Sequence, residues 1–247
     1  LDYVLGPTLL NYTWVNNETG VVWDLEEAAK LKEKSSCFIH VDAVQAVGKI
    51  KEWQKLDPRL DAYTFSGHKF GALKGVGFSF VKKTFPFRAL LRGGGQQNGL
   101  RSGTENTDAI HTLSLALQEM QEKQDFEQLE RAKELIETEI KNQMGEKIEI
   151  LGSENRRNSN TISLCFLGET PPKADKLTTA FDMAGIDVSS GSACSSGAIE
   201  PSRVLLAMGK SEQEAKSSLR FSLSPYCGPS EAKDIAERVL KVLLRYA

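Results

Sequence analysis

Short apolar segments that end in polar residues recur along the first third of the chain. The segment 37–41 is almost continuously apolar and runs into Asp42, and the segment 62–65 runs into Ser66. Apolar runs of this length are typical of strands in a parallel sheet. A helical pattern separates the first of them from an earlier strand-like segment at 9–15. This alternation predicts an α/β fold with a mainly parallel sheet.

The second half of the chain has a different pattern. Apolar residues recur at helical spacing from Ile110 to Ile140, with a polar stretch around Asp125, which predicts one long helix or two joined helices. Two strand candidates, a helix, a Gly/Ser-rich turn, another strand and a terminal helix follow. We therefore expect part of a large domain over residues 1–125 and a smaller α+β domain over residues 126–247.

Charge and cysteine content limit the function classes. The chain carries 31 lysine and arginine residues against 33 aspartate and glutamate residues, so we expect neither nucleic acid nor an anionic membrane as its partner. No apolar segment is long enough to span a bilayer, and we expect a cytoplasmic protein. The cysteines form no CxxC pair, so neither a disulfide framework nor a metal site is expected. They are Cys37, Cys165, Cys194 and Cys227.

A lysine and an aspartate stand at the ends of the two apolar segments. Schiff-base chemistry needs a lysine whose amine can lose its proton, and a carboxylate can keep a pyridine nitrogen protonated. Lys69, in the sequence Ser-Gly-His-Lys, and Asp42 have these side chains. A lysine after a strand can equally be a solvated charge, and Asp42 can equally cap a helix.

Five segments in order give the chain a resemblance to a known family. It resembles the cysteine desulfurases of NifS/IscS type, a branch of the class V aminotransferases among the fold-type I pyridoxal phosphate enzymes, over essentially its whole length. The matching segments are Val-Asn-Asn-Glu-Thr-Gly at 15–20, His-Val-Asp-Ala-Val-Gln at 40–45, Ser-Gly-His-Lys at 66–69, the Gly-rich stretch 93–104, and Ser-Ser-Gly-Ser-Ala-Cys at 189–194.

The resemblance implies a pyridoxal 5'-phosphate site. Lys69 would bond covalently to the cofactor and move protons between it and the substrate, and Asp42 would pair with the pyridine nitrogen. In family dimers the residue that matches Thr104 reaches the phosphate of the neighbouring subunit, which implies a homodimer. The other implied cofactor contacts are Gln45 at the phenolic oxygen, Ser66 and His68 at the phosphate, and Asn17.

The same resemblance implies conversion of L-cysteine to L-alanine. Asn17 and Arg220 would orient the substrate, with the guanidinium forking onto its carboxylate. Cys194 would receive the sulfur as a persulfide, which passes to an iron-sulfur scaffold or another acceptor protein. Read from its residue type alone, Cys194 could instead be an inert core thiol. His40 and His111 receive no role.

Family members carry a further segment before Val15. It supplies a Gly/Thr turn for the cofactor phosphate and a histidine that stacks on the ring, and neither occurs in these 247 residues. We therefore expect the chain to be a fragment or part of a longer protein, with the activity in that parent. Two alternatives stay open: another class V enzyme, such as a selenocysteine lyase or transaminase, and an inactive module that binds partner proteins.

Overall fold

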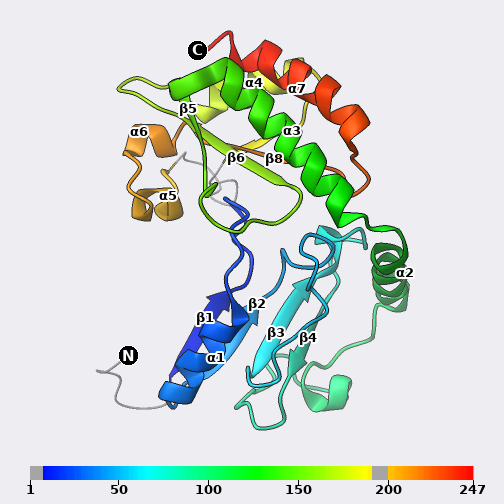
Figure 1. Ribbon diagram of the computed structural model, residues 1–247. Coiled ribbons are helices and arrows are strands. Elements are labelled where there is room, and N and C mark those ends of the chain that lie inside the picture. The colour runs from blue at the N-terminus through cyan, green and yellow to red at the C-terminus, as the bar shows by residue number, and fades with distance from the viewer. Residues whose placement is uncertain (1–7, 191–199, 247) are drawn as a thin grey trace. The chain divides into compact units, whose positions relative to one another are not determined.

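The computed structural model describes residues 8–190 and 200–246, which fall into two compact units (Figure 1). The first unit contains residues 8–15 and 23–124. The second contains the remaining described residues, including the short segment Asn16–Val22. Each unit has its own sheet and its own helices.

The first unit is built on a mixed, mainly parallel sheet. β1 pairs with β2 and β2 with β3 in parallel, whereas β4 runs antiparallel to β3. Only residues 67–76 join β3 to β4, and so short a connection cannot make the crossover that a parallel strand needs. The predicted α/β class is confirmed. In spatial order the strands are β1 (Leu9–Thr13), β2 (Phe38–Asp42), β3 (Ala62–Ser66) and β4 (Gly77–Val81).

Two helices bury apolar faces in this unit. α1 (Leu25–Lys34) joins β1 to β2 and is capped by Asp24, whose carboxylate accepts from the Glu26 amide at 2.9 Å. α2 (Thr107–Lys123) follows an irregular segment that contains the short 3₁₀ helix η2 (Gln97–Gly99). Its stripe of buried side chains has helical spacing and consists of Ala109, Leu113, Ala116 and Met120.

The second unit is an antiparallel sheet with helices, which agrees with the expected α+β class. A central strand, β6, is fully buried along its length. Neighbouring strands pair with it on both sides in an antiparallel sense. In spatial order the strands are β5 (Ile148–Ile150), β6 (Thr161–Phe166), β8 (Leu219–Ser222) and β7 (Ser189–Ser190).

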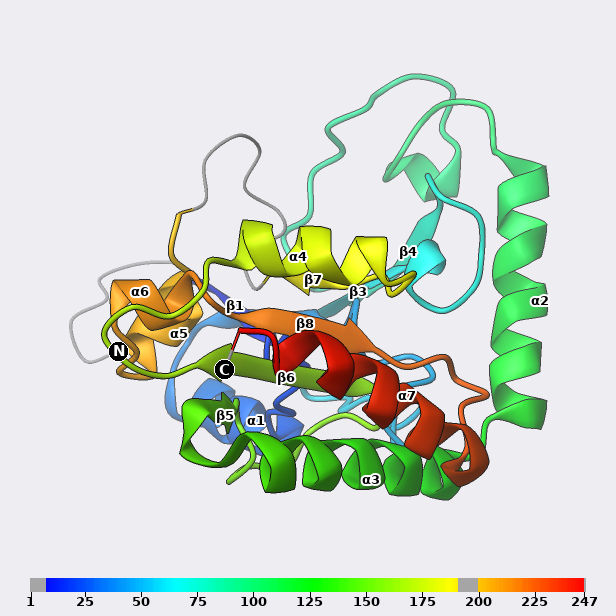
Figure 2. The same ribbon diagram turned by 90° about the horizontal axis from the view of Figure 1, so that it is seen from above.

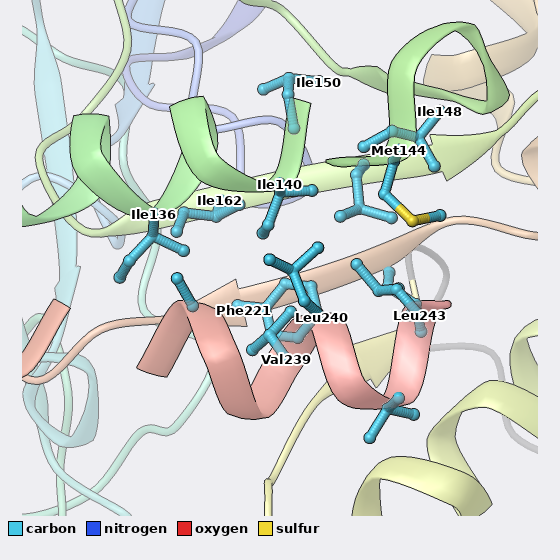
Figure 3. Packing of buried hydrophobic residues seen from close by; sticks show 14 of the residues in the cluster. Ile136, Ile140, Met144, Ile148, Ile150, Ile162, Phe221, Val239, Leu240 and Leu243 are labelled. Atoms are coloured by element: carbon cyan, nitrogen blue, oxygen red, sulfur yellow. The ribbon is translucent and has the colours of Figure 1, made fainter. Parts of the chain in front are cut away.

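Three helices cover one face of this sheet. α3 (Phe126–Met144) and α7 (Pro229–Leu243) run side by side, and α4 (Ala174–Met183) joins the same hydrophobic core (Figure 2). Figure 3 shows apolar side chains of α3 and α7 meeting Ile162 of β6 and Phe221 of β8. α2 and α3 are separate helices, because the side chain of Asp125 caps α3 through the Gln128 amide at 2.9 Å.

The other face of β6 has a smaller cover. α5 (Arg203–Ala207) and α6 (Glu212–Ala215) contribute Leu205 and Ala215, which pack with the buried Cys165. Burial raises the pKa of the Cys165 thiol to about 12. This cysteine is therefore a packing residue that stays protonated at neutral pH. Two further 3₁₀ helices complete the described elements, η1 (Gly67–Lys69) and η3 (Gly145–Lys147).

Truncation of a core leucine should strongly destabilise the second unit. Leu164 lies in the middle of β6 with none of its surface exposed. Leu164→Ala should lower the free energy of unfolding by about 2–5 kcal/mol, because it removes buried apolar surface and leaves a cavity. Leu135→Ala on α3 is the matched control, since Leu135 is 43% exposed and should cost less than about 1 kcal/mol. Urea unfolding measures both, and equal losses would contradict this packing.

Candidate functional site

Asp42 lies at the carboxyl end of β2, beside the end of β3. Its strand position pairs with Thr64, and the next amide, Ala43 N, donates to Thr64 O at 3.0 Å. One carboxylate oxygen, Oδ1, accepts from the Val44 amide at 3.0 Å. Asp42 therefore anchors the turn after β2, as a capping residue would, while its side chain stays exposed. The anchoring leaves the second carboxylate oxygen available to a ligand.

Gln45 lies in this turn on a well-packed base. The neighbouring Ala43, Ala46 and Val47 are buried. The side-chain oxygen of Gln45 accepts from the ammonium group of Lys49. The packed turn thus carries the side-chain amide of Gln45 close in sequence to Asp42.

The second strand end carries Ser66, His68 and Lys69. Ser66 ends β3, and η1 places His68 so that its Nδ1 lies 3.0 Å from the Ser66 Oγ. Lys69 is half-buried, and its amine makes no hydrogen bond or ion pair within the described residues. The turn therefore presents a hydroxyl, an imidazole and a primary amine beside the strand that ends in Asp42.

Gly67 explains why this turn holds its shape. A Cβ atom at this position would lie 2.6 Å from Leu113 Cδ2 and 3.0 Å from the Val76 carbonyl oxygen. The backbone of the turn therefore packs directly against α2, and a larger residue would push the two apart. The packing of Gly67 against α2 therefore positions the backbone that carries Lys69.

The donor set suits a phosphorylated pyridine aldehyde. Asp42 can accept from a protonated ring nitrogen, and the amine of Lys69 can condense with an aldehyde. Ser66 and His68 can donate to phosphate oxygens. All of them lie at the carboxyl ends of two adjacent parallel strands, which is where ligands bind in open α/β sheets. The residues present thus fit pyridoxal phosphate.

His40 has a structural environment on the same face of the sheet. Its Nδ1 lies 3.0 Å from Asn11 Oδ1, and its Nε2 lies 2.8 Å from Thr64 Oγ1. The Thr64 hydroxyl continues to Ser79 Oγ at 3.1 Å. Polar side chains from all four strands therefore form one hydrogen-bonded row. His40 received no predicted role, and in the structure both of its ring nitrogens have a hydrogen-bond partner.

A second group of polar residues forms a tight turn in the second unit. Asn16 organises it, because its Oδ1 accepts from the Glu18 amide at 2.9 Å, the Thr19 amide at 3.0 Å and the Thr19 hydroxyl at 3.2 Å. Gly20 closes the turn with a φ of 76°, where a Cβ atom would lie 2.7 Å from Asn158 Oδ1. Glycine is therefore required here, because the backbone has a positive φ and because a side chain would clash with Asn158.

The turn is held by a buried lysine that the sequence did not single out. Asn158 N donates to Gly20 O at 2.8 Å, and the ammonium of Lys133 on α3 donates to Asn158 O at 2.6 Å. Beside it, the guanidinium of Arg157 forks onto the Glu137 carboxylate at 2.7 and 2.6 Å. Burial lowers the pKa of Lys133. A charged residue on an amphipathic helix gives no sequence signal for this role, because solvated lysines are the usual case.

The structure brings Asn17 and Arg220 together. Arg220 lies on β8, and its Nη1 donates to the Asn17 carbonyl oxygen at 2.6 Å. Asn17 is exposed at the tip of the turn, and Arg220 is half-buried. These are the two residues predicted to orient a substrate, although 203 positions separate them. A guanidinium carries several N–H donors and can contact more than one acceptor.

The remaining predicted site residues are Thr104 and Cys194. Thr104 is exposed in the irregular segment before α2. Cys194 lies outside the described residues. In the described part of the chain, no group of three histidine, cysteine, aspartate or glutamate side chains is placed to hold a metal ion. No helix among residues 8–190 and 200–246 combines the length and apolarity needed to cross a lipid bilayer.

Comparisons with known proteins identify the family to which the chain is similar. A profile of the family Aminotransferase class-V matches residues 6–235. A cysteine desulfurase of Cereibacter sphaeroides is 37% identical over 95% of this chain, and the cysteine desulfurase NifS of Azotobacter vinelandii is 34% identical over 94%. The chain spans 58% and 57% of the lengths of these relatives. A NifS-like protein from Rickettsia africae superposes with a TM-score of 0.78 at 30% identity, covering 95% of this chain and 61% of that structure.

Proposed function

Because the chain belongs to the class-V aminotransferase family, we propose that the protein acts as a pyridoxal phosphate-dependent cysteine desulfurase. One observation carries the proposal: Asp42 and the Ser66–Lys69 turn lie at the carboxyl ends of adjacent parallel strands. The similarity to cysteine desulfurases over most of the chain supports this particular activity within the family.

The first unit would bind the cofactor. Pyridoxal phosphate, when bound, supplies a ring that accepts electrons from the substrate α-carbon. Asp42 would keep the ring nitrogen protonated, because a carboxylate stabilises a neighbouring positive charge. The amine of Lys69 would hold the cofactor and carry a proton to and from the reacting carbon. The remaining contacts would be Gln45 at the phenolic oxygen, and Ser66 and His68 at the phosphate.

The second unit would bind the amino acid. Arg220 would fork onto the α-carboxylate of L-cysteine, because a guanidinium matches the geometry of a carboxylate. Asn17, exposed beside it, would contact both substrate and cofactor. The hydrogen bond from Arg220 to Asn17 O supports a role of the second unit in substrate binding, because it fixes one end of the guanidinium before a substrate arrives.

Cys194 would accept the sulfur. Its thiolate attacks the sulfur of bound cysteine, an S–S bond forms, and the bond from that sulfur to Cβ breaks with its electron pair left on carbon. Protonation of that carbon gives L-alanine, and the enzyme keeps a persulfide. The persulfide would pass to an iron-sulfur scaffold or another acceptor protein.

A homodimer would complete the site. The segment that leads to Thr104 exposes several large apolar side chains, and such a group is typical of an interface. Thr104 would reach the cofactor phosphate of the partner subunit. The exposed side chains are Phe87, Leu90, Leu91 and Leu100.

The test is product formation by the whole protein. With pyridoxal phosphate, L-cysteine and a thiol reductant, it should release L-alanine and sulfide in equal amounts. Turnover of selenocysteine much faster than cysteine would identify a selenocysteine lyase, and a 2-oxo acid product would identify a transaminase. Absence of a visible absorbance band after addition of pyridoxal phosphate would contradict the proposal and favour a partner-binding module.

A further inference from the structure

Glu18 is a half-buried carboxylate that the proposed mechanism does not use. It follows Asn17 in the turn, and its backbone amide is fixed by Asn16 Oδ1. Its Oε2 atom is shielded from solvent and has no hydrogen-bond partner within the described residues. An acceptor left in this state destabilises the ionised form of the group.

Two side chains act on the Glu18 carboxyl group, and both come from elsewhere in the second unit. The Ser202 hydroxyl, at the start of α5, donates a hydrogen bond to it, while its oxygen accepts from Leu205 N at 3.2 Å. Arg220, on β8, donates to the carbonyl oxygen of the adjacent Asn17 at 2.6 Å and acts on the Glu18 carboxyl group through its positive charge. Both lower the pKa of Glu18, but burial outweighs them and the pKa is raised. Burial thus favours the protonated form of Glu18, whereas the charge of Arg220 favours the ionised form.

We propose that Glu18 is a positioning residue that takes up a proton when an amino-acid carboxylate binds Arg220. The inference rests on the proposed function of Arg220. An anionic Glu18 and an incoming carboxylate would share one guanidinium, and two like charges at one site repel each other. The proton comes from solvent, adds to the carboxylate of Glu18 and returns to solvent when the ligand leaves. No bond other than this O–H bond forms or breaks.

The direction of the pH effect follows from linkage. Because the bound carboxylate neutralises Arg220, the ligand binds the protonated form of Glu18 more tightly than the anionic form. Affinity should therefore fall as the pH rises through the pKa of Glu18, and it should level off on either side. Arg220 keeps its charge throughout this range, and the Ser202 hydroxyl does not titrate.

The test uses L-alanine, the product of the proposed reaction, as the probe. The whole protein with its cofactor is titrated with alanine by calorimetry over a series of pH values from about 5 to 8. At each pH, two buffers of different ionisation enthalpy yield the protons taken up per site. Glu18→Gln should take up fewer protons than the wild type. At about pH 8 it should bind alanine roughly threefold to tenfold more tightly, because a negative charge beside the guanidinium is gone.

Matched variants separate charge from structure. Glu18→Asp keeps an ionisable group and should keep proton uptake, whereas Glu154→Gln removes an exposed carboxylate of the same unit and should change neither quantity. Equal melting temperatures verify folding. If Glu18→Gln takes up as many protons as the wild type, or binds alanine more weakly, this inference is overturned. The proposed function still stands in that case, provided that the wild type turns over cysteine. Failure of the wild type to bind either amino acid overturns both.

Discussion

Lys69→Ala should lower alanine formation by at least about 10³-fold, since it removes both the amine that holds the cofactor and the group that moves the proton. The visible band of the lysine-bound cofactor should disappear with it. Lys69 suits this test because its amine has no protein partner in the described part of the chain. The substitution therefore removes the reactive amine without breaking a hydrogen bond or ion pair within the described residues. Initial rates and an absorbance spectrum measure the two effects.

Two further variants make the Lys69 result specific. Lys69→Arg keeps the positive charge but cannot condense with an aldehyde at neutral pH, so it should be as inactive as the alanine variant. Lys74→Ala removes an exposed lysine of the same unit and should keep full activity. A Lys69→Ala protein that retains activity within tenfold of the wild type would remove Lys69 from the mechanism.

The sequence predicted the strands that carry the cofactor-site residues, because continuous apolar segments reveal buried strands directly. β2 and β3 lie where those segments predicted them. The direction of β4 could not be read from its own residues, since an apolar segment has no orientation. Its reversal follows from the short connection after β3.

Elements without a strong local pattern escaped prediction. α5 and α6 are too short to show helical periodicity, and they are fixed by Leu205 and Ala215 packing against β6. β7 consists of Ser189 and Ser190, which have no strand preference, and it exists because β8 supplies hydrogen-bond partners. In both cases tertiary contacts decide the structure.

The candidate site was predictable where it follows strand ends and unpredictable where it depends on distant contacts. Asp42 and Lys69 follow apolar segments, so their proximity could be inferred from the parallel sheet. The association of Glu18, Ser202 and Arg220 joins three distant parts of the sequence. The segment Asn16–Val22 joins the second unit because Gly20 fits against Asn158, and no local pattern reveals that fit.

Cys194→Ala should abolish sulfide release while leaving the cofactor spectrum unchanged, because the variant loses the sulfur acceptor but keeps the residues proposed to hold the cofactor. The expected loss is at least about 10²-fold in steady-state turnover, since the remaining route is slow attack by free thiol. L-Cysteine should still perturb the visible band, because Asn17 and Arg220 are intact. Sulfide release and the spectral change are measured on the same sample.

The other three cysteines provide the control for Cys194. Cys37, Cys165 and Cys227 are buried, and burial raises the pKa of Cys165 and of Cys227. Since the thiolate is the nucleophile, these thiols should react slowly with iodoacetamide, and Cys37→Ala should keep full activity. Labelling of the native protein followed by peptide mass analysis should therefore find modification at Cys194 first. A Cys194→Ala protein that releases sulfide at the wild-type rate would place the sulfur acceptor elsewhere, and the labelling pattern would then identify which thiol accepts it.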